Sequence, residues 1–171
     1  MNALLFLAVA VFAQDNLTYS NPGLALSFSY PSTWKLLEGK TASEFTIPVG
    51  TTTARLEVFD VDFRADVETW QNVEKASIDQ LKRTMDRQWQ EEVLGVPLLL
   101  SKSSFTNDDG NFVALSGLLY SATPRKLRFR LTSSPETIDE AELAWRNVMQ
   151  TLRTTDGKLP ASENPDRNPE V

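Results

Sequence analysis

The 171-residue sequence contains no cysteine and no histidine. Without cysteine the chain can form neither disulfides nor thiolate nucleophiles, and it lacks the residue that carries the lipid of bacterial lipoproteins. Without histidine it can form neither a Ser-His-Asp triad nor the usual zinc and haem sites. A hydrolase would then have to rely on carboxylates or on Ser-Lys pairs. Because the sequence shows no catalytic or metal-binding signature, we expect no catalytic residue and no cofactor, and we interpret the protein as non-enzymatic.

A long block of lysine and arginine is also missing. The chain has 17 basic and 23 acidic residues, for a formal net charge of -6. Nucleic acids and anionic membrane surfaces require clustered cationic groups, so we exclude both as the main partner. With a hydrophobic content of 41%, the chain is long enough for one domain with a substantial core.

The first residues of the chain, 1–13, are apolar apart from Asn2. This composition predicts a secretory signal peptide that is cleaved after Ala13. The segment is shorter than the about 20 apolar residues that a membrane span requires. An ordinary hydrophobic N-terminal strand is the alternative interpretation. With a signal peptide, we expect a secreted or periplasmic protein that has neither a transmembrane nor a lipid anchor.

The residues that follow alternate between apolar and polar side chains. From Leu24 to Tyr30 every second residue is apolar, which predicts a strand with one buried face. Pro31 ends this strand. We predict three further strands, over residues 34–37, 44–49 and 54–63.

The middle of the chain has a helical periodicity. Asp66 suits the N-cap position, and apolar residues then recur at steps of three, four and five. These residues are Val67, Trp70, Val73, Ile78, Leu81, Met85 and Trp89. We predict one helix near residues 67–93 that lies across the sheet, with its mixed charges facing solvent. We expect the four tryptophans of the chain to lie in the core.

The second half of the chain predicts three antiparallel strands and a closing helix. Asp109 and Gly110 stand between two strand-like runs and are typical of a hairpin turn. They also look like the start of a calcium loop, but the glutamate that such a loop requires is absent. We predict strands over residues 98–106, 112–122 and 126–133, a helix over residues 135–152 and a disordered tail over residues 154–171.

The segment from Leu24 to Trp34 resembles the aliphatic-x-Phe-x-Tyr-Pro-x-x-Trp opening of PsbP-like and DcrB-like domains. Residues 56–61, followed by residues 66–70, are similar to the strand that leads into the long helix of that family. The resemblance covers residues 19–153. It implies an α+β fold, an α/β/α sandwich in which helices pack on both faces of an antiparallel sheet.

Members of this family include a lumenal extrinsic subunit of photosystem II, exported bacterial proteins and a nuclear factor that acts on a small GTPase. Their common property is binding, and they share no catalytic residue. The resemblance therefore implies an exported binding or accessory module. Its expected partner is an unknown protein or a small ligand.

Two groups of charged residues are weaker candidates for a site. Asp60 and Asp62 lie on one face of a predicted strand, and Asp66 follows it around a turn. Three such carboxylates could hold a divalent cation, or serve a carboxylate-based enzyme. The alternative is that they are solvent-facing charges and a helix cap.

The second group is a basic stripe along one predicted strand. Lys126, Arg128 and Arg130 alternate with apolar residues, and Arg125 stands beside them. An uncovered stripe of this kind could dock an acidic partner, which would make the chain an envelope-interaction protein. The alternative is that the stripe pairs with acidic residues across the sheet.

Overall fold

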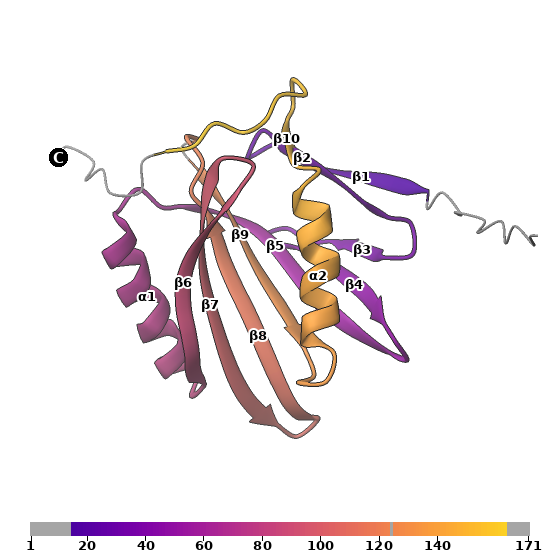
Figure 1. Ribbon diagram of the computed structural model, residues 1–171, viewed down its shortest axis with the longest axis vertical. Coiled ribbons are helices and arrows are strands. Elements are labelled where there is room, and N and C mark those ends of the chain that lie inside the picture. Colours follow the sequence, from indigo (N-terminus) through magenta and orange to yellow (C-terminus); the bar gives the residue numbers. More distant parts are fainter. Residues whose placement is uncertain (1–14, 124, 164–171) are drawn as a thin grey trace, which may run out of the picture.

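A computed structural model describes residues 15–123 and 125–163. The expected signal peptide, 1–13, and the last part of the expected tail lie outside the described residues. In this part of the chain, a seven-stranded antiparallel sheet lies between helix α1 (Val67–Gln80) on one face and helix α2 (Ile138–Met149) on the other (Figure 1). The α/β/α sandwich and the α+β class expected from the sequence are confirmed.

Two antiparallel sheets contain the ten described strands. The large sheet has the order β3-β4-β5-β9-β8-β7-β6, and the small sheet has the order β1-β2-β10. The strands of the first half are β1 (Asn16–Asn21), β2 (Leu26–Pro31), β3 (Lys35–Glu38), β4 (Ser43–Val49) and β5 (Thr52–Asp62). Those of the second half are β6 (Thr84–Val93), β7 (Val96–Asn107), β8 (Gly110–Leu119), β9 (Arg125–Ser133) and β10 (Arg153–Thr154).

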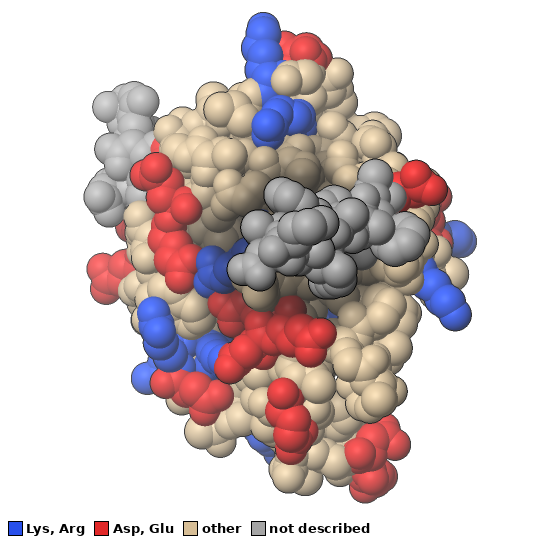
Figure 2. All heavy atoms as spheres, turned by 45° about the vertical axis from the view of Figure 1, so that its right-hand side comes forward, with Lys and Arg blue, Asp and Glu red and all other residues tan. Residues whose placement is uncertain are grey.

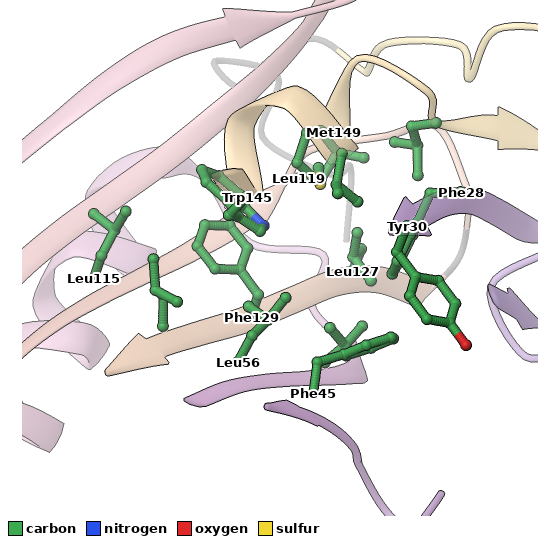
Figure 3. Packing of buried hydrophobic residues seen from close by; sticks show 14 of the residues in the cluster. Phe28, Tyr30, Phe45, Leu56, Leu115, Leu119, Leu127, Phe129, Trp145 and Met149 are labelled. Carbon is green, nitrogen blue, oxygen red and sulfur yellow. The ribbon is translucent and has the colours of Figure 1, made fainter. Parts of the chain in front are cut away.

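The main core lies between the large sheet, α2 and the small sheet. Leu26, Phe28 and Tyr30 of β2 are all buried there, as the alternation predicts. Trp145 of α2 packs on Phe129 of β9, with ring centroids 4.1 Å apart (Figure 3). Aromatic and aliphatic side chains from both halves of the chain thus close this face of the sheet.

A smaller apolar cluster lies on the opposite face, under α1. Trp70 of this helix packs with Leu99 of β7 and Leu118 of β8. Because neighbouring side chains of a strand point to opposite faces, Leu98 and Leu100 belong to the main core instead. Trp34, Trp70 and Trp145 are buried, but Trp89 is only partly buried.

The predicted helix over residues 67–93 is wrong in its second half. The helix ends at Gln80, Lys82 takes a positive φ of 54°, and β6 follows as the edge strand beside β7. Trp89 and Val93 are four residues apart, a spacing that places two side chains on one face of a helix and also on one face of a strand. Hydrogen bonding to the free edge of β7 decides between the two.

The disordered tail expected from residue 154 is also wrong for the described residues 154–163. Thr154 pairs with β2, and the backbone N–H of Ala122 donates to Ala161 O over 3.0 Å. The amide of Glu163 donates to Tyr120 O over 3.1 Å. The terminal segment thus forms backbone hydrogen bonds with the chain that follows β8. The described fold therefore extends past both ends of residues 19–153.

Candidate functional site: a groove on the sheet

The face of the sheet that carries α1 is polar over much of its area. On β9, Leu127 and Phe129 point into the main core, whereas Arg128 and Arg130 point to the α1 side. Helix α1 packs on β6 and β7, with Leu118 of β8 beneath it. Glu74 of α1 reaches Arg128 of β9, but another part of this face, over β4, β5 and β9, is left open.

A groove of about 560 Å³ lies on the uncovered part of this face. We call it the sheet groove. Five charged residues line it: Glu44, Arg55, Glu57, Arg83 and Arg130. Two phenylalanines, Phe105 and Phe112, form its apolar part, and Thr46, Thr53 and Thr132 add hydroxyl groups. Its volume lies within the range of small-molecule sites, about 300–1,000 Å³.

Four of the five charged side chains form a row of ion pairs. Arg55 Nη2 lies 2.8 Å from Glu44 Oε2 and 3.1 Å from Glu57 Oε1. The other oxygen of Glu57 lies 3.9 Å from Arg130 Nη1. The glutamates are thus held by arginines, and Arg130 is the more loosely paired of the two.

Arg83 is different, because no described acidic side chain lies within ion-pair distance of it. Its guanidinium carbon stands 4.0 Å from the centroid of the Phe105 ring, which stacks on Phe112. Burial lowers the pKa of Arg83 and the positive charge of Arg130 lowers it further, although the more distant carboxylates of Glu57 and Glu74 act in the opposite direction. The groove therefore contains a partly desolvated cation on an aromatic surface.

The structure pairs every member of the basic stripe with an acid. Arg125 Nε lies 2.5 Å from Asp60 Oδ2, and Arg128 binds the buried carboxylate of Glu74. Lys126 is only 2% exposed and pairs with Glu163 of the terminal segment. Of the stripe, only Arg130 lines the sheet groove.

The structure does not gather the three candidate carboxylates into a metal site. Asp62 lies 3.0 Å from Arg64, and Asp66 caps α1 by accepting a 2.8 Å hydrogen bond from the amide of Thr69. The hydrogen bonds from Thr69 lower the pKa of Asp66. Within residues 15–123 and 125–163, no three side chains of the His, Cys, Asp and Glu types form a group able to hold a metal ion.

The surface beside α2 offers less to a charged ligand. A hollow of about 370 Å³ beside α2 is lined by uncharged residues, among them Trp34, Pro48 and Asn147. On the face seen in Figure 2, basic side chains lie beside acidic ones rather than in one broad patch. The sheet groove combines volume, charge and aromatic surface.

Sequence reasoning identified only Arg130 among the charged residues of this groove. Arg55 and Glu57 alternate with buried Ala54, Leu56 and Val58, which is a sign of a polar strand face. That alternation could have pointed to them. The sequence did not indicate Arg83, because it lay within the predicted helix over residues 67–93. The structure ends α1 at Gln80 and places Arg83 between this helix and β6.

The sequence matches no protein-family model and no curated protein. Solved structures are similar to it in fold. Cyanobacterial PsbP (CyanoP) from Synechocystis aligns with a TM-score of 0.61 and 12% identity, over 85% of this chain and 95% of that chain. LpqN from Mycobacterium tuberculosis, described as involved in cell envelope biogenesis, aligns with a TM-score of 0.51 and 9% identity, over 84% and 86%.

A third structure, from Bacteroides thetaiotaomicron, aligns with a TM-score of 0.59 and 15% identity over 80% of this chain. The match covers 47% of that protein, so this chain spans less than half of its length. At such identities the comparisons show the fold alone, and they confirm the PsbP-like fold that the sequence resemblance implied. None of the described helices has the length and apolarity needed to span a bilayer.

Proposed function

We propose that this protein is an exported, non-enzymatic binding module that holds its ligand in the sheet groove. The observation that carries the proposal is the groove itself. It brings three arginines, two glutamates and two phenylalanines together from separate segments of the chain, on a part of the sheet that α1 leaves open. Ligand sites combine such apolar walls with a few convergent polar groups.

The residues of the groove favour binding over catalysis. Its lining offers no histidine or cysteine, and both glutamates are engaged by Arg55. General acid or base catalysis requires a group that is free to exchange a proton with the substrate. Export is supported by the apolar composition of residues 1–13. The likeness in fold to an envelope-biogenesis protein agrees with this location.

The proposal is tested by screening a library of small carboxylates, amines, sugars and neutral aromatics against the labelled protein by NMR. We expect bound compounds to shift amide signals of the groove strands, and the ligand spectra to stay unchanged with time. The variant Thr132→Trp fills the groove and should abolish these shifts. Asn147→Trp, in the hollow beside α2, is the matched control and should leave them intact.

Two results would contradict this function. One is a set of bound compounds whose shifts map to the hollow beside α2 or scatter over the surface. The other is conversion of a bound compound by the wild-type protein but not by Thr132→Trp, because that would make the groove an active site.

A further inference from the structure

The lining of the sheet groove carries a surplus of positive charge. Its three arginines face two glutamates, which leaves one positive charge in the groove of a chain whose net charge is -6. Arg55 is held by both glutamates, and Arg130 approaches Glu57. The positive charge that no glutamate of the groove pairs with is therefore that of Arg83.

The surroundings of Arg83 suit an anion. A guanidinium presents five N–H donors in a planar fork that matches a carboxylate in two parallel hydrogen bonds. The ring of Phe105 covers one face of this fork at 4.0 Å, and no hydrogen bond or ion pair from a described residue reaches it. Partial burial of the guanidinium without a partner costs free energy, and a bound anion would offset this cost.

We infer that the sheet groove binds a small monocarboxylate with a flat apolar body. Its carboxylate would lie between Arg83 and Arg130, and its body would lie along Phe105 and Phe112. The single surplus charge favours a monoanion over a polyanion, and the volume of about 560 Å³ fits a small molecule. This inference rests on the proposed function, because it names the ligand class of the same groove.

The test uses phenylacetate, its uncharged isostere phenylacetamide and inorganic phosphate, each titrated into the full protein. We expect phenylacetate to bind at least roughly tenfold more tightly than phenylacetamide, with amide shifts at the groove strands. Arg83→Gln should remove this preference. Arg83→Lys should retain part of the preference for phenylacetate, since lysine keeps the charge but lacks the planar fork. Arg64→Gln, which removes an exposed arginine outside the groove, should bind as wild type.

The contrary outcomes lead to different conclusions. If both phenyl compounds bind the groove equally, the groove still binds ligands but the inferred class is wrong. If phosphate binds more tightly than phenylacetate and loses affinity in Arg83→Gln, the ligand is an inorganic anion or phosphate group. If none of the three probes and no library compound shifts the groove signals, the proposed function falls as well. Should Arg83→Gln misfold, Arg83→Lys and Thr132→Trp carry the same comparison.

Discussion

At the scale of single residues, the contact between α1 and the sheet is partly ionic. The carboxylate of Glu74 is 3% exposed, accepts a 2.9 Å hydrogen bond from Ser101 and lies 2.5 Å from Arg128. Arg128→Met would leave that carboxylate buried without a countercharge. We expect it to lower the free energy of unfolding by about 3–5 kcal/mol in urea denaturation.

Two further variants decide whether this cost comes from the stranded charge. Arg64→Gln, which removes an exposed arginine, should cost at most about 1 kcal/mol. The double variant Glu74→Leu with Arg128→Met replaces the whole pair by apolar groups and should recover most of the loss. A double variant as unstable as Arg128→Met would contradict the argument.

A second prediction concerns Gly117 in the middle of β8. A Cβ atom at this position would stand 2.3 Å from the Phe129 ring and 3.0 Å from Leu100. Gly117→Ala therefore overpacks the core, and we expect it to lower the free energy of unfolding by about 1–3 kcal/mol. Phe129→Leu removes the ring atoms that clash. In thermal unfolding, the double variant should lose less unfolding free energy than the two single variants lose in sum. If the two losses simply add, the close contact between position 117 and the Phe129 ring is refuted.

At the scale of elements, β6 and α2 are joined by a charged pair. Glu91 accepts hydrogen bonds from Arg146 Nη1 at 2.5 Å and from Trp89 Nε1 at 2.6 Å. The hydrogen bond from Arg146 lowers the pKa of Glu91. Since the folded pKa lies below the unfolded one, the pair stabilises the protein above the unfolded pKa. That stability is lost as the pH falls through the folded pKa.

We therefore expect Glu91→Gln to cost about 1 kcal/mol near pH 7 and progressively less toward about pH 3. Urea denaturation of both proteins across this range measures the difference. Glu92→Gln, which changes the exposed glutamate next to Glu91 on β6, is the control and should leave the pH dependence of wild type unchanged. A difference that is constant with pH would mean that the ionised form of Glu91 contributes nothing.

The elements also show which parts of the fold the sequence could predict. The burial of Leu26, Phe28 and Tyr30 follows from alternation within one strand, which is a local property. The end of α1 at Gln80 is not local, because β6 forms against β7 and its apolar residues suit a helix equally well. The sheet groove was missed for the same reason. Arg55, Arg83 and Phe105 meet only after three segments have been placed by the sheet.

At the scale of the whole molecule, the described C-terminal segment closes the fold over Lys126. The ammonium of this residue donates to Ser121 O at 2.5 Å and to Thr123 O at 3.1 Å, and it pairs with Glu163. Pro160 is buried on the way. A buried cation requires this set of partners, because burial without them opposes its charge.

We expect a chain that ends at Lys158 to be less stable than a chain that ends at Glu163. The shorter chain loses the carboxylate that pairs with Lys126 and the 3.0 Å hydrogen bond from the Ala122 amide to Ala161. Its melting temperature should fall, and the Ala122 amide should exchange with solvent faster in hydrogen-exchange measurements. The exchange rate of the Leu131 amide, in the centre of the sheet, should rise only by the amount that the loss of global stability accounts for. If the two chains melt together and protect Ala122 equally, the terminal segment does not hold this corner of the fold.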